Sequence, residues 1–343
     1  MSSPLSDLGL AIPLIAAPMA GGPSTPALVM AAARAGGIGF LAAGYQEPQA
    51  LADQIAAVRS AGAPYGVNLF APNPVPVDAG AFRRYADAIQ PEADRYGIDL
   101  AGFDPVEDDD HWRDKIDILC ADPVPIASFT FGIPHRTVLA VLRKAGTLIV
   151  QTVTSAEEAR IASDAGADML AVQASAAGAH SGTLTPQHAR PAIPITDLIA
   201  QVHSAVTLPI IAAGGLATSA DVAAVLNAGA GAAMVGTALL RADESGASAA
   251  HQGALADPSR GQTILTRAFT GRPARALRNE FTDRYSSLAP AGYPAVHHLT
   301  RPLRRAAAAA GDAERISLWA GAGYQQCAAE PTGRILARLA GRL

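Results

Sequence analysis

The sequence predicts an α/β protein, a (β/α)8 TIM barrel with a helical accessory region over its active face. An alanine-rich helical stretch ending in Ala-Gly precedes a β-branched run at five places, the first at Ala35-Gly36. Three further apolar runs bring the total to roughly eight strands, the number that closes such a barrel. A doubly wound open sheet is the alternative, but no Gly-x-Gly-x-x-Gly motif follows the first strand.

Strands and helices are expected to alternate along the chain. A glycine just past a helix end takes the left-handed conformation cheaply, so each Ala-Gly pair indicates where a helix stops. Short, continuously apolar strands between helices indicate a parallel sheet that is covered on both faces. In chain order, the expected strands are residues 14–17, 38–42, 65–70, 124–129, 147–151, 169–173, 208–213 and 232–236.

Residues 72–112 interrupt this alternation. They contain the proline-rich sequence PNPVPVD, an amphipathic helix predicted near 79–95 and an acidic run at 107–110. We interpret the stretch as an elaborated loop of the barrel. The acidic run is expected to be solvated surface, with metal ligation as the alternative.

The second interruption follows the last strand. Residues 241–325 are predicted to form a helical accessory or lid region, with cationic clusters near 272–278 and 301–305. The barrel is then expected to comprise residues 1–240, joined by a C-terminal helix at 330–343 that returns to the barrel wall.

Composition excludes several classes of protein. The net charge of −4 leaves no basic stripe for nucleic acid, and no apolar stretch reaches the 18 or so residues of a membrane span. The start, MSSPLSDLGL, lacks the pattern of a signal peptide. Cys120 and Cys327 are the only cysteines, too few for a disulfide framework. We therefore expect a cytoplasmic enzyme that binds neither nucleic acid nor membrane.

Glycine-bearing turns follow the two strands that usually carry a phosphate site in such barrels. The seventh expected strand runs into Gly214-Gly215, and the eighth ends in Met234-Val235-Gly236-Thr237. Glycine lets backbone amides approach phosphate oxygens, and a helix N-terminus, as near Thr218, favours an anion. The alternative is that both are plain tight turns, but the coincidence favours a phosphorylated ligand.

Polar residues at other strand ends add to this rim. Asn68 lies in the third expected strand and Gln173 ends the sixth. An amide offers both a donor and an acceptor, which suits the polar edge of a flavin, although either residue alone is more often structural. His180 follows in a loop of small residues, where its near-neutral pKa suits proton transfer. His135, after the fourth strand, is a second candidate, for substrate contact.

These motifs resemble those of a known family. The chain is similar to the bacterial class of the nitronate monooxygenases, once called 2-nitropropane dioxygenases, and the similar segments keep their order along nearly the whole chain. They are APMAGG (17–22), AGGIG (35–39), VNLF (67–70), PIIAAGGL (209–216), GT (236–237), GRPAR (271–275), the segment 293–304 and LWAG (318–321).

The resemblance implies non-covalent FMN and a catalytic His180. It also implies FMN-dependent oxidation of an alkyl nitronate by O2, giving a carbonyl compound and nitrite, in a monomer or homodimer that needs no metal. Expected flavin contacts are Pro18, Met19, Asn68, Gln173, Gly178, Ala179, Gly214, Gly215, Met234, Val235, Gly236 and Thr237.

The loop that carries His180 departs from the pattern of the family it resembles. Ala176 stands where the family has Glu, Ala179 where it has a second Gly, and Ser181 where it has Arg. A non-glycine residue at 179 restricts the backbone, and the other two changes remove charge near His180. Two alternatives stay open: an NAD(P)H-dependent flavin reductase of the same barrel type, such as an enoyl-acyl-carrier-protein or quinone reductase, and a non-catalytic flavin-binding barrel.

Overall fold

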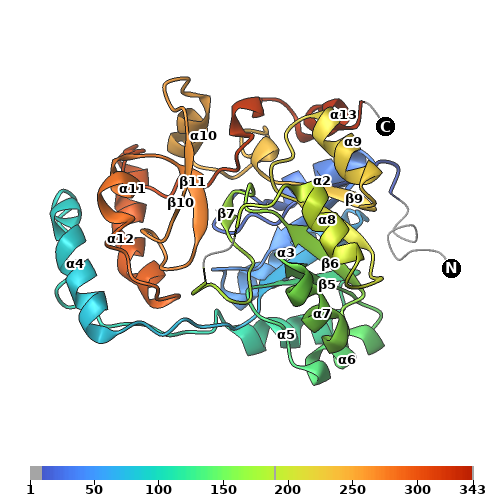
Figure 1. The fold of residues 1–343 in the computed structure, drawn as a ribbon, viewed down its shortest axis with the longest axis horizontal. Helices are drawn as coiled ribbons and strands as arrows, with labels where there is room; N and C mark the ends of the chain where they lie inside the picture. Colours follow the sequence, from blue (N-terminus) through green and yellow to red (C-terminus); the bar gives the residue numbers. More distant parts are fainter. Residues whose placement is uncertain (1–9, 189–190, 342–343) are drawn as a thin grey trace.

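The computed structural model describes residues 10–188 and 191–341, so the first nine and last two residues of the expected barrel lie outside the described part. Eight parallel strands close into a barrel in the order β1-β2-β3-β4-β5-β6-β8-β9 (Figure 1), which confirms the predicted fold class. Their bounds are β1 Leu14–Ala16, β2 Ile38–Ala42, β3 Tyr65–Phe70, β4 Ile126–Thr130, β5 Leu148–Val153, β6 Met169–Gln173, β8 Ile210–Ala213 and β9 Ala232–Val235.

Helices surround this barrel, and glycine ends several of them as predicted. Each of the five Ala-Gly pairs places its glycine at positive φ, from 65° at Gly62 to 104° at Gly229. The helices between the barrel strands are α2 Pro26–Arg34, α3 Pro48–Ser60, α5 Trp112–Ala121, α6 Arg136–Lys144, α7 Ala156–Ala165, α8 Ile195–His203 and α9 Ser219–Asn227.

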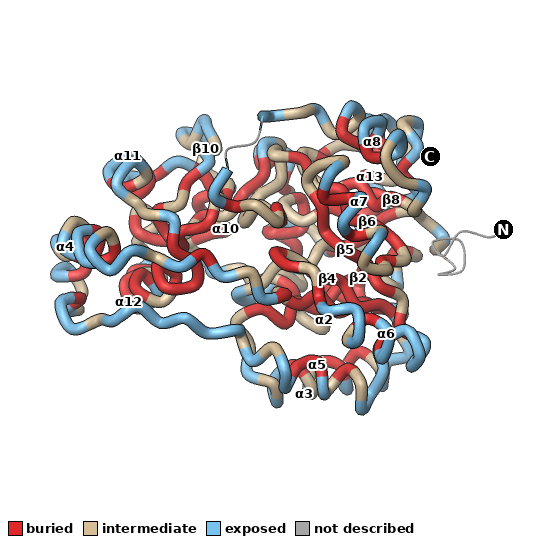
Figure 2. The backbone as a smooth tube through the Cα atoms, turned by 60° about the horizontal axis from the view of Figure 1, so that its bottom comes forward, coloured by how far each residue is buried: buried red, intermediate tan, exposed pale blue. Residues whose placement is uncertain are grey.

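The barrel interior is a packed core rather than a channel. Alternate residues of the strands point inward, among them Ile15, Phe40, Val150 and Met169, all at most 1% exposed. The opposite faces of the same strands pack on the surrounding helices. In Figure 2 the barrel strands are accordingly coloured mostly as buried. Only the loops at the ends of the strands are therefore free to build a binding site.

The accessory region is helical but also contains a small antiparallel sheet that the sequence prediction did not include. The sheet has the order β10-β11-β7, and its third strand comes from the loop after β6. Thus β7 (Ala179–His180) pairs with β11, with His180 opposite Ala274. The other elements are η1 Thr237–Leu239, α10 Ala249–Ala256, β10 Thr263–Thr266, β11 Ala274–Leu277, α11 Glu280–Tyr285, α12 Ala295–Ala309 and η2 Tyr324–Gln326.

Helix α4 (Ala79–Asp94) lies far from the barrel helices and packs beside α12 (Figure 1). Its buried face, with Phe82 and Ile89, shares one apolar cluster with Phe269, Phe281 and the buried face of α12. Although residues 72–112 leave the barrel as a loop, their helix is thus part of the accessory region's core. Periodicity predicted the helix but not its partner.

The C-terminal helix α13 (Thr332–Ala340) packs on the barrel wall. Ile335, Leu336 and Leu339 are fully buried in the cluster that includes α2 and α9. No helix in the described ranges is long and apolar enough to cross a membrane.

Candidate active site

A cavity of about 710 Å³ lies at the carboxyl ends of the barrel strands, between the barrel and the accessory region. Its volume is in the range of sites for ligands of cofactor or drug size. Loops after β1, β2, β3, β6, β8 and β9 line one side, and α12 with the segment around Trp319 lines the other. Except for His135, every site residue expected from the sequence contributes to this lining.

The two glycine turns meet at one end of this cavity. Gly214 and Gly215 have φ values of 103° and 80°, so their amides turn in a way that L-residues rarely allow. Gly236 begins the turn into η1, where an added Cβ would lie 3.4 Å from Ala17 Cβ. Both turns thus bring glycine backbone without side chains to the cavity wall, which suits a single phosphate group.

The N-terminus of α9, where the sequence suggested that an anion would be favoured, carries a carboxylate of its own. The carboxylate of Asp221 accepts hydrogen bonds from the amides of Ala217 and Thr218, at 3.1 and 2.8 Å, and from the Thr218 hydroxyl. Thr218 and Asp221 therefore form a capping box, and its carboxylate disfavours a second anion at this helix end. The phosphate-sized space is left to the glycine turns and η1.

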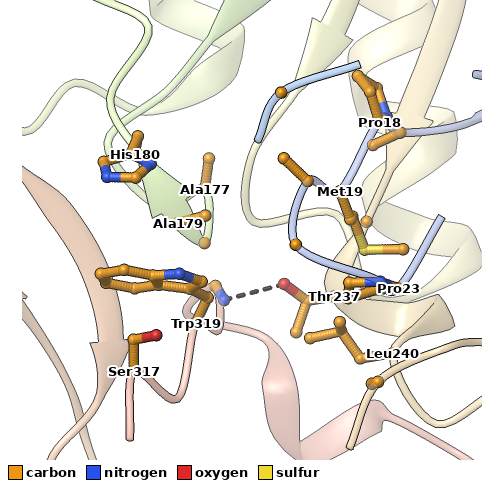
Figure 3. A pocket seen from close by; sticks show the side chains of 18 of the residues that line it. Pro18, Met19, Pro23, Ala177, Ala179, His180, Thr237, Leu240, Ser317 and Trp319 are labelled. Atoms are coloured by element: carbon orange, nitrogen blue, oxygen red, sulfur yellow. Dashed lines mark hydrogen bonds between the residues drawn. The ribbon is translucent and has the colours of Figure 1, made fainter. Parts of the chain in front are cut away.

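Thr237 links the barrel turn to the accessory region. Its hydroxyl accepts a hydrogen bond of 2.9 Å from the amide of Gly321 (dashed in Figure 3), and its carbonyl accepts one from the thiol of Cys327. The hydroxyl keeps its own hydrogen for a ligand. Across the cavity in Figure 3, Pro18 and Met19 face the strand that carries Ala179 and His180.

The two amides of the rim are both anchored. Asn68 is buried, and its amide nitrogen donates to the hydroxyls of Ser128 and Thr130 on the neighbouring strand β4. The amide of Gln173 donates to the carbonyl of His180 at 3.2 Å and accepts from the amide of Gly182 at 2.7 Å. Gln173 therefore clamps both sides of the strand that carries His180, a role that the sequence did not indicate.

Ala179 has a φ of 63°, in the left-handed region that favours glycine. The neighbouring Gly178 packs so closely on Gly321 that an added Cβ would lie 2.5 Å from its amide nitrogen. Pairing with β11 holds Ala179 opposite Arg275 in this conformation. The departure from glycine at 179 is thus accommodated at the cost of backbone strain, because the surrounding sheet fixes the strand.

His180 is enclosed by aromatic rings. Its ring centroid lies 5.3 Å from that of Trp319, 5.6 Å from Phe131 and 5.8 Å from Tyr293. Its Nε2 lies 2.9 Å from the hydroxyl of Thr270. Burial, followed by the charges of Arg272 and Arg304, lowers the pKa of His180 to about 3. The imidazole of the folded protein is therefore uncharged at neutral pH.

The accessory region supplies the positive charge of the site. Arg272 is fully buried, with its guanidinium 4.0 Å above the ring of Phe131, and burial lowers its pKa to about 10. Arg301, Arg304 and Arg305 of α12 line the cavity itself, whose described lining contains no aspartate or glutamate. The cavity therefore favours anionic ligands.

These arginines, with Thr270, Tyr45 and Trp319, are the site residues that the sequence prediction missed. The sequence did carry a signal for the arginines. The two cationic clusters and the GRPAR motif were recognised, but nothing indicated that they lie beside the strand ends. The family pattern's arginine at 181 is absent here, but Arg301, Arg304 and Arg305 bring positive charge to the cavity from elsewhere in the chain.

The structure does not bring His135 to the site. It is exposed, caps the N-terminus of α6, and pairs its Nδ1 with the hydroxyl of Thr137 at 2.9 Å. The acidic run is mostly exposed as predicted, except that Asp110 pairs with the buried Lys115 at 2.8 Å. Within the described ranges no cluster of three metal-ligating residues occurs, at the acidic run or elsewhere.

A closed (β/α)8 barrel with a covered, cationic cavity at the carboxyl ends of its strands defines an enzyme of the TIM-barrel class. The chain matches the family model described as nitronate monooxygenase over residues 2–339. It is 34% identical over 320 residues to a probable nitronate monooxygenase of Staphylococcus saprophyticus, covering 92% of this chain and 89% of that one. A protein of the same description from Staphylococcus aureus strain Newman is 32% identical over 340 residues, covering 97% and 94%.

Solved structures give the same result. The nitroalkane oxidase of Streptomyces ansochromogenes is 46% identical with a TM-score of 0.93, covering 99% of this chain and 97% of that one. FabK of Thermotoga maritima, at 24% identity and a TM-score of 0.75 over 99% and 95% of the two chains, shares the fold. The chain belongs to the nitronate monooxygenase family and is an oxidoreductase.

Proposed function

We propose that the protein oxidises alkyl nitronates with O2, using FMN, to a carbonyl compound and nitrite. The observation that carries the proposal is the combination, in one cavity, of a single phosphate-sized cradle, an uncharged, half-buried imidazole and a wall of arginines without carboxylates. A nitronate is a small anion, and such a wall attracts it before any chemistry begins.

The residues of the cavity fit FMN. The amides of Gly214, Gly215 and Gly236 and the hydroxyl of Thr237 would hold its single phosphate, and Asn68 and Gln173 would contact the polar edge of its ring. When bound, FMN would accept electrons from the nitronate and pass them to O2. Pro18, Met19, Gly178, Ala179, Met234 and Val235 would complete its pocket by packing.

His180 acts, in this proposal, as a base rather than as a cation. The hydroxyl of Thr270 donates to the carbonyl of Arg272, so we assign the proton of the imidazole to Nε2, which then donates to Thr270. Nδ1 is left with an available lone pair. That lone pair would accept the α-proton of a neutral nitroalkane, whereas a preformed nitronate needs no such transfer.

The test is to mix the purified protein anaerobically with ethyl nitronate, and separately with NADH, and to follow flavin absorbance. Rapid bleaching by the nitronate, with carbonyl compound and nitrite formed once O2 is admitted, is the expected result. Bleaching by NADH alone would overturn the proposal in favour of a reductase. A colourless protein that does not take up added FMN would remove the cofactor.

The proposal further includes a cytoplasmic enzyme that works as a monomer or homodimer on small molecules. Sedimentation equilibrium of the purified protein would give its oligomeric state directly.

A further inference from the structure

Arg304 is a partly buried cation of the cavity wall. Its Nε donates to the hydroxyl of Thr300 at 3.0 Å, and its Nη2 donates to the carbonyl of His297 at 3.1 Å. Throughout residues 10–188 and 191–341, Arg304 has no carboxylate partner and its Nη1 has no acceptor. That nitrogen is not closed off, in contrast to Nη1 of Arg272, which is buried without a partner.

The guanidinium of Arg304 is held in a fixed orientation. The hydroxyl of Thr300 is itself anchored to the carbonyl of Phe269 at 2.5 Å. The ring of His297 stacks on that of Tyr45, with 4.2 Å between centroids and 5° between planes. Because both anchors are fixed, the side chain does not have to be ordered when a ligand arrives, which lowers the cost of binding.

Arg304 also lies in a part of the cavity separate from the phosphate cradle. Tyr45, whose ring supports the anchor of Arg304, follows β2, whereas the glycine turns follow β8 and β9. The charge of Arg304 is felt at His180, on β7. The guanidinium of Arg304 therefore lies near enough to His180 to act on its charge state, and both residues line the same cavity.

We propose that Arg304 forms an anion subsite that binds the oxygens of the substrate's nitronate group. The identity of that anion rests on the proposed function. A nitronate shares its negative charge between two coplanar oxygens, and a guanidinium offers planar donors with a permanent charge. Arg304 then supplies the cationic contact to the nitronate, which the uncharged imidazole of His180 does not provide.

Nitrate is a suitable probe, because it is planar and anionic and is not a substrate. The FMN-loaded protein is titrated with sodium nitrate at constant ionic strength, followed by the flavin difference spectrum and by calorimetry. Arg304→Gln is expected to weaken nitrate binding by roughly tenfold or more, the usual effect of losing a charge-assisted hydrogen bond. FMN affinity should change by less than about twofold, since uncharged glycine amides hold the phosphate.

Arg113→Gln is the matched control. It removes the same charge from a side chain that is 90% exposed on α5, so nitrate affinity should stay at the wild-type value. Arg304→Lys keeps the charge but loses the planar fork and at least one anchor. It should bind nitrate several-fold more weakly than wild type. If circular dichroism shows that Arg304→Gln is unfolded, the nitrate affinity of Arg304→Lys becomes the test of the subsite.

Three results would overturn the subsite. The first is wild-type nitrate affinity in Arg304→Gln, or in Arg304→Lys if the glutamine variant is unfolded. The second is loss of FMN in either variant, which would assign the guanidinium to the phosphate, and the third is an equal loss of nitrate affinity in Arg113→Gln. The proposed function fails in a different way. Wild-type protein would then bind nitrate at Arg304 yet oxidise no nitronate.

Discussion

The imidazole of His180 lies 2.9 Å from the hydroxyl of Thr270, measured between Nε2 and Oγ1. This contact joins the loop after β6 to the accessory region 90 residues later in the chain. It leaves the other ring nitrogen available for chemistry and makes the accessory region part of the site. The geometry of the candidate site is therefore not a property of the barrel alone.

His180→Asn is expected to keep FMN and to lose activity, more with neutral nitroalkanes than with preformed nitronates. A positioned base typically contributes about 10²–10⁴-fold to removal of an α-proton. With a preformed nitronate, no proton has to be removed, so the loss should stay within roughly tenfold. Steady-state kinetics with nitroethane and with ethyl nitronate measure both effects. Equal losses for the two substrates would exclude the base role.

Ala179→Gly is expected to stabilise the protein. Relief of a left-handed L-residue gains roughly 1–2 kcal/mol, offset by about 0.4–1 kcal/mol of added entropy in the unfolded chain. The net gain should show as a higher urea midpoint. Ala177→Gly, in the same loop but without a positive φ, should lower it. A lower midpoint for both variants would mean that the strain at 179 is already relieved.

Gly215→Ala should lose FMN affinity. Gly146→Ala introduces comparable backbone strain, since φ is 80° at Gly215 and 90° at Gly146, but Gly146 lies at the end of α6 with nothing near its added Cβ. Gly146→Ala should lose roughly 1–2 kcal/mol of stability. Gly215→Ala should lose somewhat more, because its added Cβ would lie 3.1 Å from that of Ala176, but only Gly215→Ala should bind FMN more weakly. Fluorescence titration with FMN measures this. Unchanged FMN binding in Gly215→Ala would move the phosphate away from this turn.

Glu92→Gln should loosen α4 from the accessory region. The carboxylate is 3% exposed and lies 2.9 Å from Nε of Arg315 and 2.7 Å from Nη1 of Arg284. Burial alone would raise the pKa of Glu92, but the arginines outweigh it and lower the pKa. Breaking such a buried pair costs about 3–5 kcal/mol, measured by urea unfolding.

The surface pair of Asp104 and Arg83 provides the control for Glu92. These atoms are 3.8 Å apart, and the Asp104 side chain is 91% exposed, so Asp104→Asn should leave the urea midpoint unchanged. If the two variants lost equal stability, the buried network around Glu92 would not be what holds α4.

Stability should fall as the pH is lowered from about 6.5 to 4. Burial is the main cause that lowers the pKa of His180 to about 3 and that of His251 to about 4, from an ordinary value of 6.5. In that window the unfolded chain binds protons that the folded protein does not, so the free energy of unfolding decreases with falling pH. Each such histidine contributes a slope of about 1.4 kcal/mol per pH unit.

Urea unfolding at pH 7, 6 and 5 measures that slope. His251→Gln retains a donor for the carbonyl of Trp319, to which Nε2 of His251 lies at 3.0 Å, and removes one titrating group. Its slope should be smaller than that of the wild type by about one proton. Identical slopes would show that His251 is protonated in the folded protein.

Local sequence rules were sufficient for the barrel and for much of the rim. The Ala-Gly pairs located helix ends, apolar runs located strands, and the ends of parallel strands necessarily share one edge. Asn68, Gln173, His180, Gly215 and Gly236 could therefore be placed around one cavity before the structure was known. His135 also follows the end of a parallel strand, β4, but its side chain caps the N-terminus of α6 and does not line the cavity.

The sequence by itself determined the barrel, its glycine turns and the histidine on its rim, because each follows from neighbours within a few residues. Only the tertiary structure decided that Arg272 and Arg304 approach His180, that Gln173 clamps the histidine's strand, and that α4 packs on α12. These contacts join segments that are far apart in the chain. The charge state of His180 depends on them, since burial and neighbouring cations act through space and leave no periodic signal in the sequence.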